Sequence, residues 1–225
     1  MQVLRKSVGA ALAVLWFAPS AVAQGDARGN ALVAQFLAAY AKTSSFSAHL
    51  DVVTREGREE SHMALKLVYA RPQNIALTVL DAKEFPAANG TTVTWLGAAR
   101  ARVSTHFYGV PLAVTLPVKD NRICNLRGYS VQEVSLATEI PMLQDPSTHV
   151  KYVGPATIAG RAAECIEARG PKLLRGIERE LIWLDRTTRF PLLREMYEAG
   201  HVVYRMAFAE YEFNPHLPAA LFAAF

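Results

Sequence analysis

The side chains that could carry acid–base or metal chemistry are scattered along this sequence. No two histidines have the H-x-x-x-H spacing of a helical zinc site, and neither cysteine lies near a histidine at ligand spacing. No G-x-S-x-G turn, which would expose a catalytic serine, occurs in the chain. We therefore expect no metal and no cofactor. The histidines are His49, His62, His106, His149, His201 and His216.

Two pairs of glutamates have a spacing that could place carboxylates side by side, namely Glu178 with Glu180 and Glu195 with Glu198. Paired carboxylates are the groups that hydrolyse glycosides. Charges that alternate along a strand, however, usually form a face of the sheet that water covers. The pattern favours that second interpretation, so the sequence predicts a protein that is not an enzyme.

The first 23 residues have the three parts of a secretory signal peptide. MQVLRK carries two positive charges, SVGAALAVLWFA is apolar, and PSAVA supplies small residues before a cleavage site. The apolar run is shorter than the ~20 residues that span a bilayer, and no cysteine lies near the cut to carry a lipid. We expect cleavage after Ala23 and export of a soluble protein, beginning at Gln24, to the periplasm.

Residues 24–225 are long enough for one domain with a substantial core, and the sequence calls for no second domain. Cleavage removes Arg5 and Lys6, so the 24 basic residues fall to 22 against 20 acidic ones. No cluster of lysine and arginine alternates with aromatic residues, as a nucleic-acid surface would require. We expect no nucleic-acid partner.

The two cysteines leave two alternatives open. Cys124 and Cys165 would reach a compartment in which disulfides form, which favours a bond between them. Free cysteines are also among the most buried residues in proteins, so two separate buried thiols are the other possibility.

An amphipathic helix is predicted where the mature chain begins. In GNALVAQFLAAYAKTSS the apolar residues recur at the spacing of one helical face. They are Leu32, Val33, Phe36, Leu37 and Tyr40.

From Phe46 onward the apolar residues recur at every second position, which predicts strands. REGREE turns the chain, Arg71-Pro72 ends a strand, and Asn89-Gly90 marks a tight turn. The outline is a helix, about six strands, a helical insertion and about five more strands, which is an α+β fold with one antiparallel sheet. A sheet of about 11 strands should curl, and helices laid in its hollow would leave an apolar cleft between the two layers.

The helical insertion runs from Ser130 to Asp145. Ser130 and Glu133 have the spacing of a capping box, and Pro141 should kink or split the helix. Its apolar side is short, so we expect it to act as a lid that opens for a ligand. The residues of that side are Val131, Val134, Leu136, Ile140 and Leu143.

The more apolar side of each strand is predicted to line the cavity, although each of these residues could instead pack on a helix. Trp183, Tyr197 and Tyr211 lie on the opposite side and become the lining if the face is reversed, because a shift of one residue inverts a strand. The predicted lining is Phe46, Leu50, Val52, Met63, Leu65, Leu67, Ile75, Leu77, Val79, Val93, Trp95, Val103, Ile182, Leu184, Met196, Val202, Tyr204, Met206 and Phe208.

Five sequence stretches, which together span nearly the whole mature chain, resemble the periplasmic outer-membrane lipoprotein carrier family (LolA) in the same order. They also resemble its relative LolB and the lipid-sensing domain of RseB. Each motif is loose, but their order and spacing make the resemblance moderately specific. The stretches are LVAQFLAAYAKTSSFSAHL, LVYARPQNIALTV, NGTTVTWLG, IERELIWLDRTTRFPLLREMYEAG and FNPHLPAALF.

The resemblance implies an unclosed antiparallel barrel covered by helices, with a cavity that shelters acyl chains of a lipid or lipoprotein. It implies a membrane release complex and an outer-membrane receptor as further partners. The alternative within the same family is a regulatory protein that senses lipid or binds a partner chain. The carrier's functional arginine matches no single position, since Arg55, Arg71, Arg100 and Arg102 all lie near predicted strands.

Overall fold

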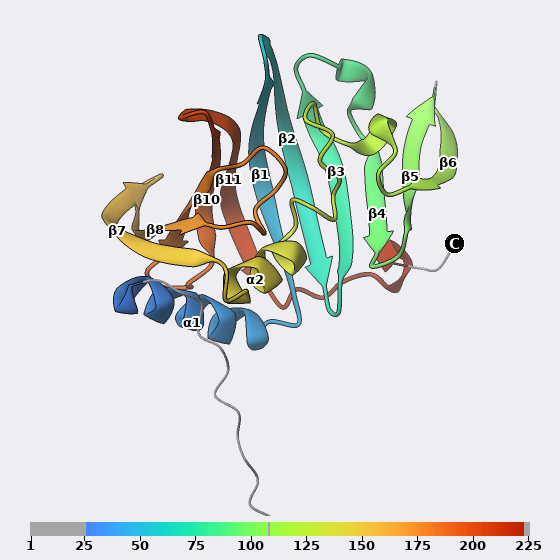
Figure 1. The fold of residues 1–225 in the computed structure, drawn as a ribbon. Coiled ribbons are helices and arrows are strands. Elements are labelled where there is room, and N and C mark those ends of the chain that lie inside the picture. Colours follow the sequence, from blue (N-terminus) through green and yellow to red (C-terminus); the bar gives the residue numbers. More distant parts are fainter. Residues whose placement is uncertain (1–25, 108, 223–225) are drawn as a thin grey trace, which may run out of the picture.

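A single antiparallel sheet of eleven strands forms the body of the protein (Figure 1). The computed structural model describes residues 26–107 and 109–222, so the predicted signal peptide lies outside the described residues. Six strands precede the helical insertion and five follow it, as predicted. They are β1 (Ser45–Glu56), β2 (Glu59–Ala70), β3 (Asn74–Ala82), β4 (Thr92–Leu96), β5 (Arg100–Phe107), β6 (Val110–Pro117), β7 (His149–Ile158), β8 (Arg161–Arg169), β9 (Arg179–Asp185), β10 (Pro191–Glu198) and β11 (His201–Phe213).

The strand order explains why the sheet stays open. It runs β6-β5-β4-β3-β2-β1-β11-β10-β9-β8-β7, so every neighbour in the sheet is a neighbour in sequence except β1 and β11. The edge strands β6 and β7 are not paired with each other, and both carry proline, which lacks the N–H that a further ladder would need. The predicted unclosed antiparallel sheet is confirmed.

The first helix, α1 (Ala27–Ala41), begins at Asp26 and packs on β7 and β8. The Asp26 carboxylate accepts a hydrogen bond from the backbone N–H of Gly29 at 2.6 Å and another from that of Tyr152 in β7 at 2.6 Å. It therefore caps the helix and also fixes the helix to the edge of the sheet. The predicted stripe faces the core, with Leu32, Val33 and Phe36 buried.

The insertion between β6 and β7 differs from the prediction in where its helix begins. Ser130 and Glu133 do bond, with Ser130 N and Oγ donating to Glu133 Oε2 at 3.0 and 2.8 Å, but they close a turn. The helix, α2 (Leu136–Gln144), starts after Ser135 and continues through Pro141. The predicted start at Ser130 is wrong, and of the kink or split predicted at Pro141 the split is not found. Pro141 is tolerated because it removes only one backbone hydrogen bond from a helix that tertiary contacts hold.

Strand β11 contains two extra residues that change which side chains face inward. Its pairing shifts by one residue near Val203 against β10 and again near Glu210 against β1, where Glu210 has a positive φ of 52°. Each β-bulge inverts the alternation beyond it. Val203 therefore joins the core in place of Val202, and Tyr211 turns inward although it was expected on the opposite face.

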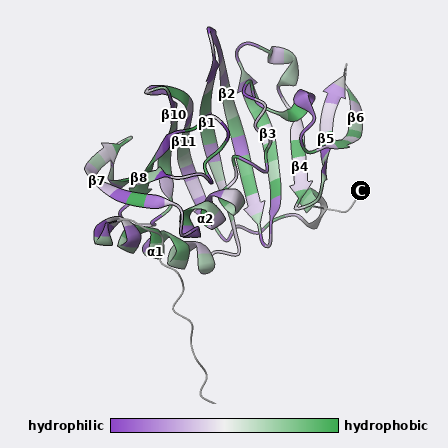
Figure 2. Cartoon of the chain, in the orientation of Figure 1, coloured by the Kyte–Doolittle hydropathy of each residue, from purple (hydrophilic) through white to green (hydrophobic). Residues whose placement is uncertain are grey.

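Two different layers cover the concave face of the sheet. Helices α1 and α2 lie over the half formed by β7–β10, whereas the irregular segment 118–135 passes in front of the other half (Figure 1). Hydrophobic and hydrophilic residues alternate along the strands, most clearly on β2 and β3 (Figure 2). The C-terminal turn η3 (Ala219–Phe222) contacts β3. Within the part of the chain that the structure describes, no helix has the length and apolar character to cross a bilayer.

Candidate functional site: an apolar cavity

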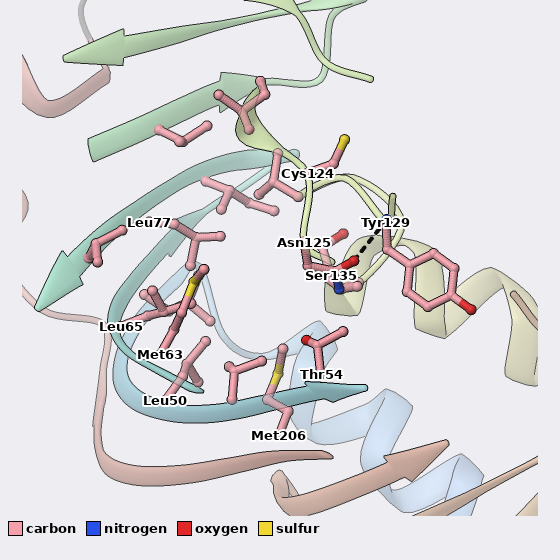
Figure 3. A pocket seen from close by; sticks show the side chains of 18 of the residues that line it. Leu50, Thr54, Met63, Leu65, Leu77, Cys124, Asn125, Tyr129, Ser135 and Met206 are labelled. Atoms are coloured by element: carbon pink, nitrogen blue, oxygen red, sulfur yellow. Dashed lines mark hydrogen bonds between the residues drawn. The ribbon is translucent and has the colours of Figure 1, made fainter. Parts of the chain in front are cut away.

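A cavity of about 320 Å³ lies between the concave face of the sheet and the segment in front of it. In Figure 3, Leu50, Met63, Leu65 and Leu77 of the sheet face Cys124 and the rest of that segment across open space. Pockets that bind small ligands have roughly 300–1,000 Å³ and mostly apolar walls. The size and walls of this cavity therefore suit one slender apolar ligand.

Most of the predicted lining residues lie on the wall of this cavity. Cross-strand pairing sets them in rows, such as Leu67 opposite Leu77, Leu77 opposite Val93, and Val93 opposite Val103. Because the pairs share one face, the apolar wall is continuous from β11 to β5. The predicted residues on the wall are Phe46, Leu50, Val52, Met63, Leu65, Leu67, Ile75, Leu77, Val79, Val93, Val103, Tyr204, Met206 and Phe208.

The remaining predicted lining residues do not reach the cavity. Ile182, Leu184 and Met196 are fully buried in the half of the sheet that the helices cover, so they form core instead of lining. Trp95 is also buried, and its indole N–H donates to the carbonyl of Ala98 at 2.6 Å. Val202 lies across from Tyr197 on the outer face, because the bulge at Val203 intervenes.

The alternative lining of the opposite face is not found. Trp183 and Tyr197 are absent from the cavity wall. Tyr211 does turn inward, but it stacks on Phe208 and Phe213 in an aromatic cluster around Phe190, at the α1 side of the core. The face that sequence alternation favoured is the face that lines the cavity.

The front wall of the cavity, which we call the roof, consists of residues 122–136. Of the predicted lid residues, Val131, Val134 and Leu136 line the cavity, whereas Ile140 and Leu143 pack in the core beside it. The roof therefore begins earlier than the predicted lid and has little regular structure. The first part of the roof could not be predicted from the sequence because an irregular segment has no periodic pattern of apolar residues. Its lining residues are Arg122, Ile123, Cys124, Asn125, Tyr129, Val131, Val134, Ser135 and Leu136.

Arg127 holds the roof to the ends of two strands. Its guanidinium lies 2.7 Å from Glu56 and 2.6 Å from Glu198, and its side chain is only 7% exposed. It also donates to the hydroxyl of Tyr129, which in turn donates to the carbonyl of Arg175 at 2.8 Å. Charge-assisted hydrogen bonds in a partly buried site are the stronger kind, so the roof is fixed at this end.

The predicted alternative of a disulfide is not found, because both cysteines are free thiols. Cys124 is half-buried on the roof, and Cys165 is fully buried in β8. Burial raises the pKa of both thiols, that of Cys165 to about 12. The two thiols thus lie in separate parts of the fold. The number of residues between them in the sequence could not show whether they would meet.

We expect these thiols to react at very different rates. A small alkylating reagent should modify Cys124 in the folded protein, whereas the thiol of Cys165 should react only after unfolding, because burial blocks access and suppresses the thiolate. Mass spectrometry of the protein with and without denaturant measures both. A Cys124→Ser variant that still takes up label in the folded state would contradict the assignment. An apolar ligand should slow labelling of Cys124, because this residue lines the cavity.

The candidate catalytic carboxylates occupy other roles. Glu178 accepts a hydrogen bond from the backbone of Gly200, and Glu195 accepts one from the hydroxyl of Tyr197. Glu180 departs from the expected water-covered face, since it is 2% exposed and contacts Arg194. Among residues 26–107 and 109–222, no group of three or more potential metal ligands comes together.

Comparison with known proteins finds similarity in structure alone. No family model matches the sequence, and no curated protein does either. MucB is similar over 89% of this chain and 64% of its own, with 15% identity and a TM-score of 0.55. An uncharacterised conserved protein from Thermus thermophilus has 12% identity and a TM-score of 0.52, over 85% of this chain and 93% of its own.

A LolA superfamily protein from Nitrosomonas europaea is also similar, with 10% identity and a TM-score of 0.42, over 87% of this chain and 97% of its own. At such identities a likeness shows the fold alone. The likeness to MucB and to the Thermus thermophilus protein is therefore one of fold, and the chain has the unclosed antiparallel sheet with covering helices that the sequence motifs led us to expect.

Proposed function

We propose that the protein binds acyl chains of a lipid or lipoprotein in its cavity and carries them through the periplasm. The observation that carries this proposal is the apolar cavity between the sheet and the roof, whose wall is built by side chains from β1–β5 and β11. Transfer of an acyl chain from water gains ~0.8 kcal/mol per methylene group, so a chain of about 16 carbons contributes roughly 12 kcal/mol. Shelter of that kind needs no catalytic residue.

A binding titration tests the proposal. The mature protein should bind a fluorescent fatty acid saturably, with about one molecule per chain, because the cavity is finite and its apolar walls meet one slender ligand. Isothermal calorimetry or fluorescence enhancement gives the stoichiometry. Binding that never saturates would indicate a sticky surface and would overturn the proposal.

A second candidate, the binding of a protein partner, is favoured by the edge strand β6. Val110, Leu112 and Val114 are exposed by 59%, 47% and 53% and share one face. Val114 lies opposite Val103 of the cavity wall, so this apolar strip continues the wall beyond the roof. Mass spectrometry of the purified protein separates the candidates: copurified lipid supports carriage, whereas an empty cavity that no fatty acid enters supports partner binding.

A further inference from the structure

Beneath the roof, three ionisable side chains are buried together. Arg194 of β10, Glu139 of α2 and Glu180 of β9 are exposed by 1%, 4% and 2%. The Nε of Arg194 donates to Glu180 at 2.8 Å, and its Nη2 donates to Oε2 of Glu139. The Nη1 of Arg194 donates to the carbonyl of Val134 in the roof at 3.0 Å. One guanidinium therefore joins two strands, the helix and the roof of the cavity.

The charges of this cluster do not balance. Two carboxylates face one guanidinium, so full ionisation would leave a net negative charge away from water, which is strongly unfavourable. Glu139 Oε1 is buried and has no hydrogen-bond partner among the described residues. A carboxylate oxygen left without a donor is poorly stabilised as an anion, whereas a protonated carboxyl relieves the excess charge.

Among the described residues, Arg194 is the only cation that acts on Glu139. Burial raises the pKa of Glu139 to about 8, Arg194 opposes this rise, and Glu180 adds to it. The phenol of Tyr204 in β11 also lies near this cluster, and burial raises its pKa, so it stays neutral. The geometry and the charge count thus agree that Glu139 holds the proton.

We propose that Glu139, Glu180 and Arg194 form a proton-binding site that fastens the roof of the cavity. With one proton bound, the site is neutral and Arg194 holds α2 and Val134 in place. Loss of the proton leaves two buried anions on one cation, which weakens the docking of α2 and of the roof. This inference deepens the proposed function, since ligand affinity would then depend on the proton.

The sign of the effect on stability follows from proton linkage. In the unfolded chain a glutamate ionises near pH 4.3, whereas the buried Glu139 keeps its proton up to about pH 8. Folding therefore takes up a proton between these values, and the stability that the proton provides is lost as the pH rises through this window. Above the window both states are ionised and the dependence ends.

Thermal unfolding and NMR test the site directly, whether or not a lipid binds. Between pH 5 and pH 8.5, the Tm of the native protein should fall by roughly 10 °C relative to that of Glu139→Gln, whose amide stays neutral. In protein labelled with ¹³C at the glutamate carboxyl, the signal that disappears in Glu139→Gln should titrate near pH 8. If the Tm values of the two proteins changed with pH in the same way, the proposal would be overturned. An NMR titration midpoint of Glu139 below about pH 5 would also overturn it.

Glu180→Gln provides a reciprocal variant. It leaves Arg194 with a single carboxylate, so the charges balance when Glu139 is ionised. The titration midpoint of Glu139 should therefore fall by about one pH unit or more. An unchanged midpoint would show that the charge count does not govern the site.

The coupling to the cavity is measured with a fluorescent fatty acid at pH 6 and pH 9. The affinity of the native protein should fall about tenfold relative to that of Glu139→Gln, which also corrects for ionisation of the fatty acid itself. If the ratio of the affinity of the native protein to that of Glu139→Gln were the same at both pH values, the coupling would be disproved. If neither protein binds the fatty acid at either pH, the proposed function fails, while unfolding and NMR still decide whether the proton site exists.

Discussion

Replacing Arg194 with methionine is expected to lower the free energy of unfolding by about 3–5 kcal/mol at pH 7. Methionine keeps much of the length of the side chain but removes the cation that pairs with Glu139 and Glu180. The carboxylate of Glu180 would then be buried without its counter-charge, and both Glu139 and the carbonyl of Val134 would lose their donor. The roof and α2 should loosen before the sheet does.

Denaturant unfolding measures this loss, with the same dependence of the unfolding free energy on denaturant concentration applied to both proteins. Arg205→Met is the matched control. Arg205 lies on β11 with its side chain 38% exposed and its guanidinium 3.5 Å from Glu195. Exposed pairs of this kind contribute less than about 1 kcal/mol. The loss in Arg194→Met should shrink toward pH 5, where the carboxyls can be neutralised by protons. A loss below about 1 kcal/mol at pH 7 would contradict the structural role of Arg194.

Replacing Leu65 with tryptophan is expected to weaken binding of a fatty acid by more than tenfold while the fold persists. Leu65 points into the cavity from β2, and Met63 and Leu77 lie beside it (Figure 3). The larger ring would displace roughly two to three methylene groups of the ligand, worth about 2 kcal/mol, and 1.4 kcal/mol is a factor of ten in Kd.

Lys66→Trp makes the same addition at the next residue of the same strand. Lys66 is exposed and faces the other side of the sheet, so the tryptophan there should leave the affinity unchanged. Calorimetry with one fatty acid gives both affinities, and thermal unfolding verifies that both variants fold. Equal affinities for the two variants would show that the ligand lies elsewhere, for instance on the exposed strip of β6.

The sequence alone was enough for features that depend on neighbouring residues. The helix with Leu32, Val33 and Phe36 on one face was found because its apolar spacing repeats every three to four residues. The strands before the insertion were found by their alternation, which also selected the face that lines the cavity. These signals are local, and burial on one side of an element is what produces them.

The tertiary structure alone decided features that join distant segments. An extra residue near Val203 and another near Glu210 invert the alternation of β11, and only the pairing with β10 and β1 reveals them. The roof is irregular and leaves no periodicity in the sequence. In the sequence, Glu180 belongs to a run of alternating charges and Glu139 carries no signal of its own, because what makes them unusual is Arg194, 14 and 55 residues away along the chain. Burial of all three depends on α2 docking over β9 and β10, and no local pattern encodes that contact.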